Sequence, residues 1–232
     1  EKIFCVSEFI KKKFLEGLNG NFQKVNVLYN GVERKLKKFP IKKKEILFVG
    51  RLVAEKGVDL YVEVIKGIAN RFPDWNFHLI GSFRLGCDKN KSLFASNIIK
   101  NFKKIGNQTQ FHGFKNQNFV QEKMKSASII IIPSIWEEPF GLVAAEAMSN
   151  GIAIIASDIG GIPEIVKKNG ILIKNINQIK LQHELENLMN NSSKIKKLQK
   201  LSWINFEHTS KNSSEKLDDY RNRILLDYFV NN

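Results

Sequence analysis

Between residues 46 and 173, short and mostly apolar runs alternate with longer segments of helical periodicity. The runs lie at 46–49, 76–81, 109–112, 128–132, 152–156 and 170–173. Runs that are apolar at nearly every position are typical of strands buried on both faces of a sheet. Strands that alternate with helices favour parallel βαβ units. The pattern therefore predicts an α/β fold, a doubly wound Rossmann-like parallel sheet with helices on both faces.

The same pattern divides the chain into three predicted segments. Residues 46–175 form the Rossmann-like domain, and residues 176–232 form C-terminal helices. Residues 1–45 combine a basic helical pattern at 7–18 with a charged stretch that has no periodicity. We expect them to be the remnant of an N-terminal domain followed by an interdomain linker. The chain opens on Glu1, in what looks like the middle of a domain, and this indicates a fragment of a longer protein.

Composition excludes several other classes of protein. Hydrophobic residues make up 43% of the chain and charged residues 26%, as in ordinary globular domains. No apolar run approaches the roughly 18 residues that a membrane-spanning helix needs. Cys5, Cys87 and the histidines lack the spacing of metal ligands, so we predict no metal site. The expected location is the cytoplasm.

The net charge of +14 has two interpretations. It arises from 37 basic and 23 acidic residues, and the excess is greatest within residues 1–45. One interpretation is a bias toward lysine and asparagine on solvated faces. The other is docking of the basic end on an anionic surface, such as the inner face of a membrane. Aromatic residues are not interleaved with the lysines, so no nucleic acid is expected as a partner.

A first candidate site follows the strand at 46–49. Gly50 permits a tight turn, and Arg51 and Lys56 lie on either side of the turn that leads into the next helix. Cations are unfavourable at a helix N-terminus unless an anion is present. Arginine offers a planar fork and lysine a point charge, and this pair suits a diphosphate. The alternative is two surface cations.

A second candidate site follows the strand at 128–132. Phe140, Gly141 and Leu142 offer backbone N–H groups at a helix start, where phosphate oxygens bind. Glu138 precedes this turn, and Glu146 lies in an otherwise apolar helix. A buried acid without a partner is costly. We expect the two carboxylates to bind the hydroxyl groups of a ribose and a sugar.

A third and weaker candidate is the glycine pair at 160–161, followed by Pro163 at a predicted helix start. Two glycines after a strand permit close approach of another backbone or of a ligand, and the sequence leaves both open. The chain has neither the Walker loop nor the glycine-rich dinucleotide motif.

Together, and in this order, these motifs resemble the C-terminal donor-binding domain of the retaining glycosyltransferases of family 4 (group 1). The matching segments are VGRLVAEKG (49–57), LIGS (79–82), FHGF (111–114), PSIWEEPFGLVAAEAMSNG (133–151) and SDIGGIPEIV (157–166). These enzymes have the type B fold of two Rossmann-like domains, so the resemblance implies that this chain is one half of such a pair.

The resemblance also implies roles for individual residues. Arg51 and Lys56 would hold the donor diphosphate as the electrostatic clamp on the leaving group, next to Gly50. Glu138 would bind the transferred sugar and Glu146 the ribose hydroxyls. The backbone of the helix start and the FHGF segment would complete the donor site; the residues concerned are Phe140, Gly141, Leu142, Gly113 and Phe114.

The implied activity is transfer of a hexose from a nucleotide diphosphate sugar, such as a UDP- or GDP-hexose, to a glycan or lipid-linked acceptor, with no required cofactor or metal. Polysaccharide or lipopolysaccharide biosynthesis is the expected process. The family's acceptor-binding N-terminal domain is missing, so we expect this chain to bind the donor and to transfer sugar poorly or not at all alone.

Two alternatives stay open at this point. One is a non-catalytic nucleotide-sugar-binding module, and the other is a basic domain that binds a membrane or a nucleic acid. The sequence does not decide the base, the sugar, the acceptor or the oligomeric state.

Overall fold

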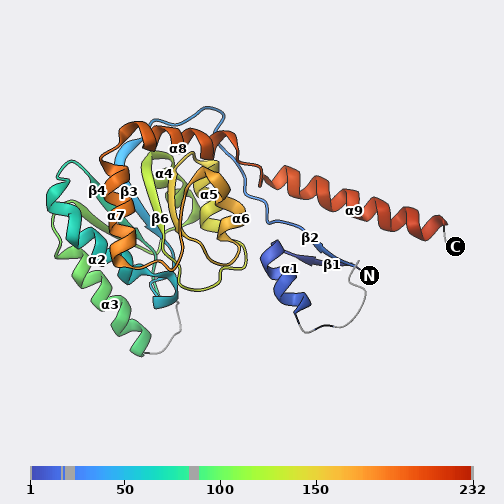
Figure 1. Cartoon of the computed structure of the whole chain (residues 1–232), viewed down its shortest axis with the longest axis horizontal. Coiled ribbons are helices and arrows are strands. Elements are labelled where there is room, and N and C mark those ends of the chain that lie inside the picture. The colour runs from blue at the N-terminus through green and yellow to red at the C-terminus, as the bar shows by residue number, and fades with distance from the viewer. Residues whose placement is uncertain (1, 17, 19–23, 84–88, 231–232) are drawn as a thin grey trace.

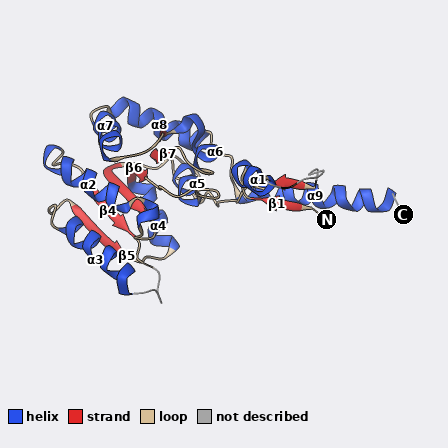
Figure 2. Ribbon diagram, turned by 60° about the horizontal axis from the view of Figure 1, so that its bottom comes forward, coloured by secondary structure: helices blue, strands red, loops and turns tan. Residues whose placement is uncertain are grey.

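The computed structural model describes residues 2–16, 18, 24–83 and 89–230. Its main body is a six-stranded sheet covered by helices. A small N-terminal unit and the last helix lie to one side of this body in both views (Figure 1, Figure 2).

All neighbouring strands of the main sheet pair in parallel, in the order β5-β4-β3-β6-β7-β8. The strands are β3 (Lys43–Val49), β4 (Asn76–Ile80), β5 (Thr109–Gly113), β6 (Ala127–Ile132), β7 (Ala153–Ser157) and β8 (Ile171–Ile173). Counted along the chain this is the 3-2-1-4-5-6 order of the doubly wound fold. The predicted fold class is confirmed, and the strand order reverses between β3 and β6.

Strand β3 begins earlier than the apolar run at 46–49. Lys43 pairs with Ala127 of β6, and its carbonyl accepts a hydrogen bond from the Ser128 hydroxyl at 2.5 Å. Charged residues can occupy the first positions of a buried strand because their side chains reach solvent at its end. The end of the segment predicted as a linker is therefore part of the sheet.

Helices cover both faces of the sheet. The helices α2 (Val58–Ile68), α3 (Lys89–Lys103) and α7 (Gln178–Met189) share a core with Ile46 and Phe48 of β3. On the other face α4 (Gln117–Ser126), α5 (Leu142–Ser149) and α6 (Ile162–Val166) pack with Leu47 of the same strand. Successive side chains of a strand point to opposite faces, so one strand serves both cores. Short 3-10 turns occur at Ala54–Lys56, Ala69–Arg71 and Lys167–Asn169.

The C-terminal segment is helical, as predicted. Helix α8 (Ser192–Ile204) crosses the end of the sheet at which β6 begins, and Gln199 donates to the Ser128 carbonyl at 3.0 Å (Figure 1). Leu181 and Leu185 of α7 are fully buried in the same core as α2. Helices α7 and α8 therefore complete the covering of the sheet.

The N-terminal unit consists of β1 (Ile3–Cys5), α1 (Glu8–Leu15) and β2 (Val25–Val27), with the two strands parallel. Ser7 is the N-cap of α1, since its side chain accepts from the Ile10 N–H at 3.1 Å. Strand β1 was not predicted. The last helix, α9 (Ser210–Val230), passes this unit, and Tyr220 meets Phe4 edge-on with ring centroids 5.1 Å apart.

Several further features concern only the part of the chain that the structure describes. No helix in it combines the length and the apolar character needed to cross a membrane. No group of three or more His, Cys, Asp or Glu side chains in it is arranged to hold a metal ion. Cys5 is buried as a free thiol, and Cys87 lies outside the described residues.

A core substitution tests whether α7 unfolds together with the sheet. We expect Leu185→Ala to lower the free energy of unfolding by about 2–5 kcal/mol, because it opens a cavity in the shared core. Ile179 of the same helix is 82% exposed, so Ile179→Ala is the matched control and should change little. Urea unfolding followed by circular dichroism measures both. A separate early transition in Leu185→Ala, with the remaining transition unchanged, would contradict a core shared by α7 and the sheet.

Candidate functional site

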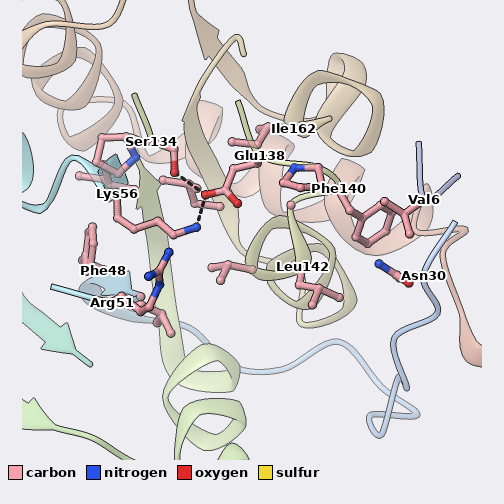
Figure 3. Close-up of a pocket in the computed structure, with 18 residues that line it drawn as sticks. Val6, Asn30, Phe48, Arg51, Lys56, Ser134, Glu138, Phe140, Leu142 and Ile162 are labelled. Carbon is pink, nitrogen blue, oxygen red and sulfur yellow. Dashed lines mark hydrogen bonds and ion pairs between the residues drawn. The ribbon is translucent and has the colours of Figure 1, made fainter. Parts of the chain in front are cut away.

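The loops that follow β3 and β6 meet at the carboxyl end of the sheet, where the strand order reverses. Crevices at such a reversal are the usual ligand sites of doubly wound sheets. Here the loops enclose a pocket of about 530 Å³ (Figure 3). Val6 and Asn30, from the N-terminal segment, form part of its wall.

The loop after β3 carries both predicted cations. Arg51 is exposed and Lys56 is half-buried at the end of a 3-10 turn, and both side chains line the pocket (Figure 3). Helix α2 starts only after Gly57, whose φ of 63° lies in the left-handed region. A Cβ at Gly57 would lie 2.0 Å from the Pro133 carbonyl oxygen, so only glycine lets the two loops approach this closely.

Backbone hydrogen bonds also join the two loops. The carbonyl of Glu55 accepts from the N–H groups of Ile135 and Trp136, at 3.0 and 3.2 Å. The loop that carries the cations and the loop that carries the acids are thus held together before any ligand binds.

Glu138 and Lys56 form an ion pair in the pocket (Figure 3). The side chains of Lys56 and Glu138 are 22% and 15% exposed, and the Ser134 hydroxyl donates to the same Glu138 oxygen at 2.8 Å. Sequence reasoning did not single out Ser134. Its position four residues before the acid, at the end of a strand, is the signal that could have found it.

The neighbouring acid, Glu137, points elsewhere. It is half exposed, and its carboxylate lies 3.7 Å from the Lys13 amine of α1. Of the two adjacent glutamates, Glu138 is thus the one that lies in the pocket.

Glu146 lies apart from this pocket, on α5. Its carboxylate accepts a hydrogen bond from the Gln117 side chain of α4 at 2.7 Å. Burial raises the pKa of Glu146, and the Gln117 hydrogen bond acts in the opposite direction. Gln117 is a second residue that the sequence analysis missed.

The start of α5 has the geometry expected of an anion site. Gly141 has φ 97° and precedes the helix, and Leu142 lines the pocket. Within the described residues, the N–H groups of Phe140 and Gly141 donate to no other backbone carbonyl. Phe140 lines the pocket, and its buried ring lies beside the rings of Tyr29 and His208.

The FHGF segment lines an adjoining pocket of about 420 Å³. Phe114 is 75% exposed at its rim, and Val49, Gly50 and Arg51 belong to both pockets. Gly113 does not line it; its carbonyl accepts from the Gly81 N–H at 2.9 Å. The two pockets therefore share a wall at Arg51.

His112 of this segment meets His78, which is far from it in sequence. His78 Nδ1 and His112 Nε2 are 3.0 Å apart, and the rings are stacked. Burial lowers the pKa of both, that of His78 to about 4, so the pair is neutral near pH 7.

The glycine pair lies behind the acid loop and supports it. A Cβ at Gly160 would lie 2.5 Å from the Glu138 backbone nitrogen, and one at Gly161 would lie 2.7 Å from the Pro139 oxygen. The Gly161 N–H donates to the Glu138 carbonyl at 2.7 Å. The sequence left open whether these glycines approach another backbone or a ligand. In the structure they approach the backbone of the loop that carries Glu138.

Glu164, just after this pair, connects the site to the N-terminal unit and was also missed. Its carboxylate accepts from the N–H groups of Glu8 and Phe9 at 2.8 and 2.7 Å, and from the Tyr29 hydroxyl at 2.9 Å. An acid is favourable at a helix N-terminus. Ser7 adds a 2.5 Å hydrogen bond to the Pro139 carbonyl, so α1 is fixed to the loop that carries Glu138.

A sequence profile described as Glycosyl transferases group 1 matches residues 32–202 of the chain. The chain belongs to the glycosyl transferases group 1 family. The predicted resemblance to the group 1 glycosyltransferases is thereby confirmed, and the matched residues include both loops of the pocket.

Relatives of this group 1 chain are found in archaea and bacteria. An uncharacterized glycosyltransferase of Methanocaldococcus jannaschii is 33% identical over 193 residues, which are 82% of this chain and 50% of the relative. Spore coat protein SA of Bacillus subtilis is 30% identical over 167 residues, 69% of this chain and 43% of the relative. The chain spans about half the length of the curated relatives it matches.

Solved structures share the fold. Anabaena HepE, in complex with UDP and glucose, matches with a TM-score of 0.81 and 18% identity, over 95% of this chain and 62% of that one. A glycosyltransferase from Rickettsia africae matches with a TM-score of 0.81 and 22% identity, over 97% of this chain and 64% of that one.

Proposed function

We propose that this chain is the donor-binding half of a retaining glycosyltransferase, which transfers a hexose from a nucleotide diphosphate sugar to a glycan or lipid-linked acceptor. The observation that carries the proposal is the convergence of Arg51, Lys56 and Glu138 on one pocket at the strand-order reversal. Family membership and the UDP complex of Anabaena HepE support it.

In this proposal the ligand extends across both pockets. The diphosphate lies between Arg51, Lys56 and the N–H groups at the start of α5. The sugar lies against Glu138 and the base near Phe114, while Glu146 binds the ribose hydroxyls. Each acid thus meets hydroxyl donors rather than phosphate.

The proposed reaction is a front-side displacement. The acceptor hydroxyl oxygen bonds to the anomeric carbon as the bond from that carbon to the diphosphate oxygen breaks. The hydroxyl proton passes to the departing diphosphate. Negative charge on the leaving group increases in the transition state, and Arg51 and Lys56 are placed to stabilise it.

The proposal also assigns a role to each of the three segments of the chain. Residues 1–45, apart from the start of β3 at 43–45, belong with an acceptor-binding domain and its linker. Residues 46–175, with that start of β3, bind the donor, and residues 176–232 form helices, the first two of which cover the sheet. UDP and GDP are the proposed donor nucleotides. The alternative function, a binding module without chemistry, predicts donor binding but no transfer by the whole protein.

Calorimetric titration with UDP, GDP, ADP and their hexose conjugates tests the donor site. We expect saturable binding of one nucleotide, weakened about 10- to 100-fold in Arg51→Ala through loss of charge-assisted hydrogen bonds. Arg71 pairs with Glu186 on α7, away from the pocket, so Arg71→Ala is a control with the same change of charge. Equal loss in both variants, or binding of no nucleotide, would contradict the proposal.

The role of Glu146 predicts a pH dependence. Burial raises its pKa, so the carboxylate becomes protonated at higher pH than an exposed glutamate and then accepts weaker hydrogen bonds from the ribose. Nucleotide affinity should therefore fall as pH is lowered from about 8 to about 5. Since Glu146→Gln cannot titrate, its affinity should approach that of the unmodified chain at the acidic end. A constant ratio of the two affinities would exclude this role.

We further propose that the protein is located in the cytoplasm or at the inner face of the membrane. In the second case its basic end would attach to anionic lipids. Lys11, Lys12 and Lys13 are consecutive on α1, and Phe14 beside them is 43% exposed. Flotation with vesicles of phosphatidylcholine alone, or with added phosphatidylglycerol, tests it. We expect binding only to the anionic vesicles, and equal behaviour in both would remove this part.

A further inference from the structure

Lys56 and Glu138 are paired with each other in the pocket, although the proposed function assigns them to different parts of the donor (Figure 3). Lys56 is assigned to the diphosphate and Glu138 to the sugar. We propose that this ion pair makes the site discriminate against nucleoside diphosphates that carry no sugar, with Glu138 as the specificity-determining residue. The inference rests on the proposed function.

The charges of the pocket make this competition unavoidable. In the part of the chain that the structure describes, the charged residues that line it are the cations Arg51 and Lys56 and the acid Glu138. A diphosphate that binds Lys56 must therefore take it from Glu138 or share it. Both side chains are largely buried, so solvent compensates the separated charges only in part.

The two kinds of ligand leave Glu138 in different states. A bare nucleoside diphosphate ends in a phosphate beside the carboxylate. Among the described residues, the Ser134 hydroxyl is then the donor that remains to Glu138. A nucleotide sugar places hydroxyl donors where that terminal charge would be. The sugar thus replaces the hydrogen bonds that Glu138 loses with Lys56, whereas the bare nucleotide leaves an unpaired and repelled charge.

The Lys56–Glu138 pair also favours release of the product after sugar transfer. The departing nucleoside diphosphate is the ligand without sugar, and the return of Lys56 to Glu138 opposes its retention. The loop contacts favour that return. The Glu55 carbonyl and Gly57 hold the lysine loop against the acid loop, so the pair needs only side-chain motion to re-form.

The test is Glu138→Gln, which keeps the shape and removes the charge. With the nucleotide selected by the calorimetric panel, we expect affinity for the bare nucleoside diphosphate to rise about 3- to 10-fold, because its phosphate no longer has to break a largely buried ion pair whose attraction desolvation offsets in part. Affinity for its hexose conjugate should fall. Glu137→Gln is the matched control, because it makes the same change of charge outside the pocket. We expect it to alter neither affinity.

A second variant has the opposite expected sign. Ser134→Ala removes the remaining donor to Glu138, so bare nucleotide should bind a few-fold more weakly than in the unmodified chain. Thermal unfolding of each variant checks that it is folded. If Glu138→Gln does not fold, the affinity of Ser134→Ala for bare nucleotide is the test of the inference.

The outcomes separate this inference from the proposed function. If the unmodified chain binds nucleotide through Arg51 but Glu138→Gln binds bare nucleotide equally or more weakly, discrimination by the ion pair is wrong and the donor site stands. If the unmodified chain binds no nucleotide, the donor site itself is wrong, and this inference with it.

Discussion

The parallel pairing of β3 with β6 is the constraint on which the rest of the structure depends. These strands are separated in the chain by β4 and β5, yet Ile46 lies opposite Ile129 and Leu47 opposite Ile130 in the sheet. Their pairing directs two loops out of the same edge of the sheet. Gly57 then lets the loops touch, and the Glu55 carbonyl joins them. Cations from one loop and an acid from the other meet as a result.

Opposite charges in one partly buried pocket give the site its chemical character. A pocket lined only by cations would hold any phosphate, whereas in the proposed function Glu138 favours a ligand that presents hydroxyl groups beside its phosphates. Buried ion pairs are weak evidence for stability, because desolvation offsets their attraction. In this pocket the proposed importance of the Lys56–Glu138 pair is that a ligand which binds Lys56 must separate the pair or share the lysine.

The N-terminal unit is coupled to the same pocket. Glu164 accepts from the first N–H groups of α1, and Ser7 donates to the Pro139 carbonyl one residue after Glu138. Movement of α1 would therefore shift the loop that carries Glu138. Val6 and Asn30 make this unit a wall of the pocket rather than a separate appendage.

The sequence alone determined the fold class, because fully buried strands must be apolar at nearly every position and the runs show it directly. It also selected Arg51 and Lys56 as candidates, because cations at a helix start are unfavourable without an anion. Glu138 was selected by its place in a segment that resembles the family. Only the tertiary structure decided which groups are partners. The Lys56–Glu138 pair, the two stacked histidines and the hold of Glu164 on α1 each join residues distant in the chain. Strand order and loop approach create such contacts, and local periodicity carries no information about either.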